Sequence, residues 1–138
     1  MNANALILAL VLAAPASAWA DESLYARLGG QAALETVVDG LLQRATRDPR
    51  IQEFFKDTNV RHLRTQLVEQ LCAASGGPCR YEGETMKNAH AAMGLRMAHF
   101  NALVEDLQDA LDAAGVPFAL QGELLALLAP MHRDIVTR

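Results

Sequence analysis

Apolar residues recur at helical spacing along most of the chain, and glycine or proline separates the periodic stretches. The predicted helices cover residues 22–28, residues 31–46, a stretch that Asn59 caps and Gly76 interrupts, and then residues 85–93, about 96–114 and about 119–136. One or two further turns begin at Asp48-Pro49, because Asp caps helices and proline is favoured at the first helical position. In the helix after Asn59 we expect a buried stripe made by Val60, Leu63, Leu67 and Leu71. The pattern predicts a single all-α domain.

The amino-acid composition points to the same fold class. The chain has 138 residues, of which 51% are hydrophobic and only 5% aromatic, and Ala and Leu outnumber the β-branched residues. Its 12 basic and 16 acidic side chains give a formal net charge of −4, and Lys and Arg form no cluster. A surface that neutralises phosphates is not expected, so neither nucleic acid nor an anionic membrane is an expected partner.

Residues 1–20 have the features of a secretory signal peptide. Residues 5–14 form an unbroken apolar run, and small residues around Ala18 and Ala20 follow it. The run is about half as long as a bilayer-spanning helix, so no membrane span is expected. The segment before the run carries no Lys or Arg, which departs from the usual pattern. We expect a protein exported to a bacterial periplasm, with a mature domain of residues 21–138 after cleavage behind Ala20; Ala18 is the other candidate position.

Cys72 and Cys79 stand on either side of the turn-forming sequence SGGP. Such a turn brings the two Cα atoms within reach of a disulfide. In an oxidising compartment a local disulfide is the first interpretation, and a pair of buried free thiols is the alternative. The spacing differs from that of CxxC zinc motifs, so a metal site at these cysteines is disfavoured.

The segment after this turn contains the candidate chemistry. About ten residues from Gly76 to Met86 lack helical periodicity, and loops of this length in small domains usually serve a function. In the helix that follows, His90 is the only polar member of a stripe with Met86, Met93 and Met97. A lone histidine on an apolar face is most often a core residue bonded to a carbonyl.

The surroundings expected for His90 favour a cofactor instead. The preceding helix offers a second apolar face with Leu63 and Leu67, aromatic residues lie between the two faces, and no other titratable group joins His90. One imidazole in a wide apolar slot suits a haem iron, whereas zinc requires four ligands. The sequence offers no Ser/His/Asp or Cys/His set for hydrolysis, and no glycine motif after a strand for binding phosphate.

Six short motifs follow one another between Leu24 and Val136. They are Leu24–Gly30 (LYARLGG), Asp48–Phe55 (DPRIQEFF), Gly76–Pro78 with Tyr81–Gly83, Met86–His90 (MKNAH), His99–Phe100 and Leu128–Pro130. In this order and spacing they make the chain resemble a group I truncated haemoglobin. The resemblance implies a truncated globin fold, which is a two-over-two helical sandwich that holds haem b. It also implies a mostly unwound segment before the proximal histidine, which accounts for the long loop.

The resemblance assigns roles to individual residues. His90 matches the proximal ligand of the haem iron. The positions that match the lining of the haem cavity are Phe54, Phe55, Tyr81, Met86, Leu95, Met97 and Phe100. For each of these the alternative is ordinary core packing. Lys87 and Arg64 are candidates for binding the haem propionates, and each would otherwise lie on a solvated helix face.

On the distal side the sequence departs from the family's common pattern. Leu42 stands where many relatives have a tyrosine, Leu67 stands where glutamine is frequent, and Leu63 occupies the distal-gate position. We therefore expect an apolar distal pocket made by Leu42, Leu63 and Leu67. Gln66 is the only nearby side chain expected to donate a hydrogen bond towards the iron.

The remaining histidines are interpreted as surface residues. His62 should point about 100° away from Leu63, towards the pocket rim or solvent, although rotation of its helix would let it reach the sixth coordination position of an iron. His99 and His132 lie near helix ends. Tyr25 is expected to pack the first short helix.

These features predict an exported haem b protein that binds oxygen, CO and nitric oxide. Whether the same iron also turns over nitric oxide as a dioxygenase, or peroxide as a weak peroxidase, is left open, and no residue pattern identifies a redox partner. The alternative is a haem-free helical binding module or inhibitor of the cell envelope, whose methionine-rich face contacts protein.

Overall fold

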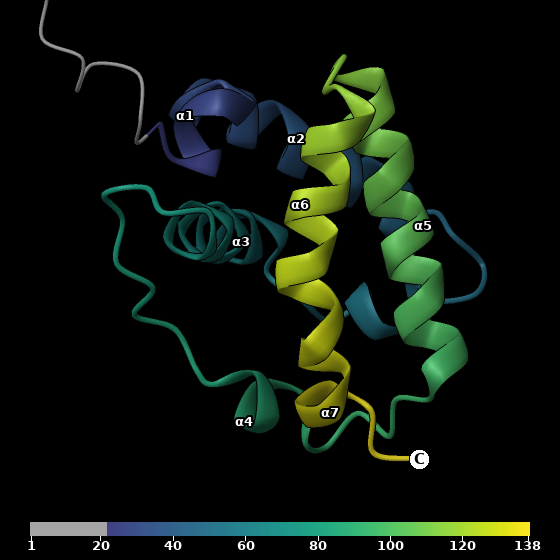
Figure 1. Ribbon diagram of the computed structural model, residues 1–138. Coiled ribbons are helices and arrows are strands. Elements are labelled where there is room, and N and C mark those ends of the chain that lie inside the picture. The colour runs from purple at the N-terminus through teal and green to yellow at the C-terminus, as the bar shows by residue number, and fades with distance from the viewer. Residues whose placement is uncertain (1–21) are drawn as a thin grey trace, which may run out of the picture.

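The computed structural model describes residues 22–138, and within that range every regular element is a helix (Figure 1). The predicted signal peptide and its cleavage site lie outside these residues. The elements are α1 (Leu24–Leu28), α2 (Gly30–Ala45), the 3-10 turn η2 (Gln52–Phe55), α3 (Val60–Ala74), α4 (Met86–His90), α5 (Met97–Ala113), α6 (Phe118–Leu128), the 3-10 turn η3 (Ala129–Met131) and α7 (His132–Ile135). The predicted all-α fold is confirmed. No helix in the described range is both long enough and apolar enough to cross a membrane.

The long helices pack around α2, which contacts both α3 and α5. Figure 1 shows α5 and α6 running alongside each other, with α3 viewed end-on beside them. The most deeply buried side chains come from α2, α3, α5 and α6, and they are Leu34, Val37, Val38, Cys72, Leu111 and Leu124. Below this core the short helix α4 packs against α7. The end of the chain thereby covers the segment that carries His90.

Local sequence explains where these helices begin. The side chains of Ser23, Asn59 and Thr85 accept hydrogen bonds of 3.1–3.2 Å from backbone N–H groups in the first turns of α1, α3 and α4. Gly29 adopts a φ of +109°, so that α1 can end at Leu28 and α2 can begin at Gly30 with a single residue between them. The start of α4 is therefore fixed only five residues before His90.

The buried face of α3 differs from the predicted stripe. Val60 is 39% exposed, and the residues that enter the core are Val68, Leu71 and Cys72. Leu63 and Leu67 are only half-buried, because they face a cavity instead of the packed core.

Two predicted helices end earlier than expected. α4 stops at His90, and the chain turns at Gly94, where φ is +63°. The final helix, predicted to continue to residue 136, is interrupted after Leu128. Pro130 has no N–H group and its ring collides with the preceding helical turn, so η3 intervenes before α7 begins.

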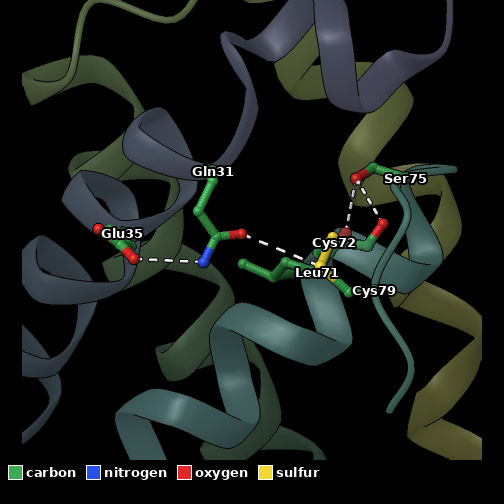
Figure 2. Close-up of a disulfide and its surroundings, with 6 residues drawn as sticks. All are labelled: Gln31, Glu35, Leu71, Cys72, Ser75 and Cys79. Atoms are coloured by element: carbon green, nitrogen blue, oxygen red, sulfur yellow. Dashed lines mark hydrogen bonds between the residues drawn. A yellow bond between two sulfur atoms is a disulfide. The ribbon is translucent and has the colours of Figure 1, made fainter.

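The predicted disulfide is present between Cys72 at the end of α3 and Cys79 in the following loop, with the Cα atoms 5.7 Å apart (Figure 2). The Ser75 hydroxyl donates a 2.6 Å hydrogen bond to the carbonyl oxygen of Leu71, which ends the helix within the same turn. On the other side, Cys79 Sγ lies 3.9 Å from Oε1 of Gln31 on α2. The bond joins α3 to the loop that leads to α4.

Candidate functional site

Two adjoining cavities of about 360 and 130 Å³ lie between α3, α4, α5, α7 and the segment around η2. Their linings overlap, and the residues common to both are Leu41, Phe54, Phe55, Leu63, Leu67, His90, Met93, Phe100, Leu103 and Ile135. All of these are apolar except His90. The shared walls make the two cavities parts of a single apolar slot.

His90 is the last residue of α4, and its half-buried ring lines both cavities. Its Nδ1 atom lies 2.7 Å from the carbonyl oxygen of Met86. Because a carbonyl only accepts hydrogen bonds, Nδ1 carries the proton in the neutral ring and Nε2 keeps a free electron pair. An imidazole oriented in this way is a suitable ligand for a metal at Nε2.

The donor set fits a haem. A largely apolar slot, with the His90 imidazole lining both of its cavities, can hold an iron whose other ligands come from a porphyrin. It cannot satisfy a bare zinc or calcium ion, which needs several ligands. Among residues 22–138 no group of three His, Cys, Asp or Glu side chains is placed to bind a metal ion. His90 would therefore hold the iron, and the apolar walls would contact the two faces of the porphyrin.

Most predicted lining residues are brought together at this slot. Phe54, Phe55, Leu63, Leu67, Phe100 and His90 line both cavities, Tyr81, Met86 and Gln66 line the larger one, and Leu42 and Leu95 line the smaller one. Residues from η2, α3, α4 and α5 meet here although they are far apart in sequence. The helices expected on the two sides of the slot, α3 and α4, do enclose it.

Met97 does not reach the slot. It begins α5, its side chain is 43% exposed, and it lines neither cavity. The sequence spacing placed it on one helical stripe with His90, but the helix ends at His90 and the chain turns at Gly94 before α5 starts. The predicted lining position is therefore corrected to a surface position.

The two candidates for propionate binding lie outside the lining. Lys87 is exposed on α4. Arg64 is half-buried on α3, and its Nε and Nη2 atoms donate to the two carboxylate oxygens of Asp39 at 2.5 and 3.0 Å. This bidentate hydrogen bond lowers the pKa of Asp39. A propionate would have to share or replace that bond, whereas the Lys87 amine is free of any ion pair within the described residues.

Tyr81 closes the loop side of the larger cavity. Its hydroxyl donates a 2.7 Å hydrogen bond to the carbonyl oxygen of Glu84, just before the Thr85 cap of α4. Burial, reinforced by nearby carboxylates, raises the pKa of the phenol. Tyr81 therefore stays neutral and fixes the approach of the chain to α4.

The three leucines expected on the distal side all line the slot. Leu42 is only 6% exposed and lines the smaller cavity, while Leu63 and Leu67 line both. Gln66 reaches the larger cavity.

A second amide there, Gln70, was missed by sequence reasoning, although it follows Gln66 by one helical turn. Its Nε2 donates to the sulfur atoms of Met86 at 3.1 Å and Met131 at 3.5 Å, so it bridges α3, α4 and η3.

Two of the three other histidines are not surface residues. His99 lines the smaller cavity, meets the Phe54 ring edge-on at 4.9 Å between centroids, and accepts the backbone N–H of Arg96 at Nδ1. His132 is half-buried, with its ring centroid 6.1 Å from that of Phe100. His62 is exposed, as expected. Tyr25, a residue of α1, is half-buried and packs against the core, as expected.

A charged cluster lies behind the wall of the smaller cavity. Asp106 follows Ala102 by one turn of α5 and is 7% exposed, and in the described chain its Oδ2 atom has no hydrogen-bond partner. Its Oδ1 is 4.0 Å from Nη2 of Arg50, while the same nitrogen lies 2.8 Å from Oδ2 of Asp48. Burial and the neighbouring Asp48 raise the pKa of Asp106 to about 6. The hydrogen bonds from Arg50 hold the pKa of Asp48 well below its usual range.

Comparison with known proteins agrees with the fold and the slot. Residues 23–137 match the bacterial-like globin family. The group 1 truncated hemoglobin GlbN of Mycolicibacterium paratuberculosis is 42% identical over 115 residues, which cover 83% of this chain and 85% of that protein. GlbN of Synechocystis sp. is 37% identical over 122 residues, which cover 84% and 98%. The crystal structure of truncated hemoglobin from Tetrahymena pyriformis in the Fe(III) form has a TM-score of 0.82 at 31% identity, and the match covers 85% of this chain and all of that one, 100%.

These matches, together with an all-α fold and a largely apolar slot that His90 lines, define a globin. The chain belongs to the bacterial-like globin family, and within it to the group 1 truncated haemoglobins, which bind haem. The predicted truncated globin fold, a two-over-two helical sandwich, is confirmed by the same likeness.

Proposed function

We propose that this chain is an exported haem b protein that binds diatomic gases at an iron ligated by His90. The observation that carries the proposal is the 2.7 Å contact of His90 Nδ1 with the Met86 carbonyl, which leaves Nε2 free in a largely apolar slot. When bound, haem b would supply an iron that takes O₂, CO or nitric oxide in its sixth position. Every other task falls to the side chains around it.

The slot walls exclude water and orient the porphyrin. Phe54 and Phe55 come from η2, Phe100 from α5 and the leucine pair Leu63 and Leu67 from α3, so apolar atoms approach from three sides. Exclusion of water protects a ferrous iron and strengthens whatever electrostatic contacts the slot contains. Lys87, exposed at the rim beside Met86, is the basic group best placed for a propionate.

The apolar side chains expected on the distal side of the slot favour some functions of a haem protein over others. Leu42, Leu63 and Leu67 would offer a diatomic ligand in the slot no hydrogen bond, because their side chains carry no donor. Such a site favours rapid exchange of ligands, sensing or redox turnover of nitric oxide or peroxide over long-term oxygen storage.

Export is supported by two observations of different kinds. The sequence begins with a secretory pattern up to Ala20, and the Cys72–Cys79 disulfide is typical of proteins that fold in an oxidising compartment. Intact mass of the protein recovered from cells tests this part. The expected mass corresponds to a chain that begins near Asp21 and lacks two hydrogens at the cysteines, whereas retention of residues 1–20 would contradict export.

Haem binding is tested by titration of the purified protein with haemin. We expect a stoichiometric Soret band in the wild type and in His62→Ala, and loss or displacement of that band in His90→Ala. His62 is a matched control, because it is also a helical histidine but is exposed and lines neither cavity. Absence of a Soret band in the wild type would favour the haem-free binding module.

A further inference from the structure

The loop between α3 and α4 has almost no backbone attachment to the rest of the protein. Within residues 22–138, no backbone–backbone hydrogen bond begins or ends in residues 78–84. The hydrogen bond from the Tyr81 hydroxyl to Glu84 lies inside the segment and does not fasten it to another element. The disulfide at Cys79 is therefore the principal attachment of this loop, aided by the packing of Tyr81 into the larger cavity.

The disulfide also stands directly between two walls of the slot. Leu71, the residue before Cys72, lines the larger cavity from α3, and Tyr81, two residues after Cys79, lines it from the loop. The chain then passes through the Thr85 cap into α4 and reaches His90. Cys79 is thus linked by a short stretch of chain both to the lining residue Tyr81 and to α4.

We infer that the Cys72–Cys79 disulfide is a redox-controlled tether that sets how tightly the slot retains haem. The inference rests on the proposed haem site. With the bond intact, the loop is already held near its bound position, so less conformational entropy is lost when haem orders the slot. With the bond reduced, residues 78–84 are free to move, and haem has to order them as it binds.

The redox step is a thiol–disulfide exchange with a dithiol reductant. Cys72 is fully buried and Cys79 is half-buried, so the reductant's thiolate attacks Cys79 Sγ. The S–S bond breaks, Cys72 leaves as a thiolate that takes up a proton, and a mixed disulfide forms at Cys79. The reductant's second thiol then displaces Cys79, so the protein gains two electrons and two protons while the reductant becomes a disulfide.

Thermodynamic linkage makes the inference quantitative. If the disulfide strengthens haem binding by a given factor, haem must strengthen the disulfide against reduction by the same factor.

The first measurement is the rate at which haemin passes from the protein to excess apomyoglobin, with and without a phosphine reductant. We expect reduction to accelerate haem loss about tenfold or more, within the usual range of coupling between sites. The Cys72→Ala/Cys79→Ala variant should lose haem quickly under both conditions, which controls for direct effects of the reductant on haem.

The second measurement compares the dithiol concentration that half-reduces the disulfide in haem-free and haem-loaded protein. The haem-loaded form should need more reductant, by the ratio of the haem dissociation constants of the reduced and oxidised protein. Equal haem loss from oxidised and reduced wild-type protein would overturn the inference, and so would reduction that is indifferent to haem.

A third measurement does not depend on haem retention. Arg80 is exposed in the tethered loop, and Arg61 is exposed at the start of α3. Reduction should accelerate tryptic cleavage after Arg80 and leave cleavage after Arg61 unchanged; equal acceleration at both, or none at Arg80, would contradict a local tether. Failure of wild-type protein to bind haemin in either redox state would instead refute the proposed function, so the two failures are distinguishable.

Discussion

The Nδ1 atom of His90 lies 2.7 Å from the carbonyl oxygen of Met86, one turn earlier in the same short helix. A histidine bonded to a carbonyl is what an ordinary core position would show, and it is also how a metal-ligating histidine is commonly oriented. What separates the two roles is the space around the ring. Among the described residues, His90 is the only polar side chain that lines both cavities of the slot, because His99 lines the smaller cavity alone.

The apolar distal wall predicts fast release of oxygen. Introduction of a hydroxyl by Leu42→Tyr should slow O₂ dissociation by roughly 10- to 150-fold, because a donor to the charged outer oxygen is worth about 1.5–3 kcal/mol. CO carries less charge and should respond less. Stopped-flow dissociation measures both ligands, and Leu42→Phe is the matched control, since it adds the same ring without the hydroxyl. Slow release from the wild type, with no difference between the tyrosine and phenylalanine variants, would contradict an apolar pocket.

The two amides of α3 should behave differently. Gln70 already donates to the sulfur atoms of Met86 and Met131, whereas Gln66 reaches the larger cavity without a hydrogen bond of its own in the described chain. Gln66 is therefore free to turn towards a bound ligand. Gln66→Leu should accelerate O₂ dissociation more than Gln70→Leu does, and the same stopped-flow assay compares them. A larger acceleration in Gln70→Leu would identify Gln70 as the distal donor.

The buried carboxyl of Asp106 should make stability depend on pH. Burial and Asp48 raise its folded-state pKa from 3.8 to about 6, so the fold favours the protonated form. The resulting stability is fully present below the unfolded pKa and is lost as the pH rises through about 6. The pKa of Asp48 is lowered, first of all by its hydrogen bonds with Arg50. The stability that Asp48 contributes is therefore present above the ordinary pKa of an aspartate and is lost only in acid, as the pH falls below that value.

Asp106→Asn should therefore be more stable than the wild type at about pH 8, by up to about 3 kcal/mol, and the advantage should shrink as the pH falls towards about 4. Urea unfolding at several pH values measures the difference. Asp57→Asn is the control, because Asp57 is an exposed aspartate that does not contribute to the pKa shift of Asp106. A constant difference between wild type and Asp106→Asn at all pH values would show that Asp106 does not titrate in this range.

Much of the fold follows from residues that act locally. The Asn59 and Thr85 caps set the starts of α3 and α4, and Gly76 follows the end of α3, so local residues located α3 and the start of α4, whereas α4 ends before Gly94. The break after Leu128 was missed although Pro130 was visible, since the apolar pattern continues on both sides of it. Periodicity reports which residues face the core but does not report that a helix is interrupted.

The site residues that could be predicted from the sequence are those that residue type and position within a motif identify. His90, the phenylalanines and the distal leucines carry their roles in the motifs that surround them. His99 and Gln70 do not, because each meets the slot only after α3, α4, α5 and η3 have packed together. The prediction that Met97 lines the slot was wrong for a related reason. Its spacing from His90 would place both residues on one face only if a single helix continued from His90 to Met97, and the helix ends at His90.

The most direct test of the account is chemical rescue of the proximal position. His90→Gly removes the imidazole and leaves space beside the slot, and imidazole added to the solution can then occupy that space as a free ligand. We expect His90→Gly with haemin to show an altered Soret spectrum that returns to the wild-type spectrum when imidazole is added, while His62→Gly shows the wild-type spectrum throughout. A wild-type spectrum in His90→Gly without imidazole would contradict the assignment of His90 as the iron ligand.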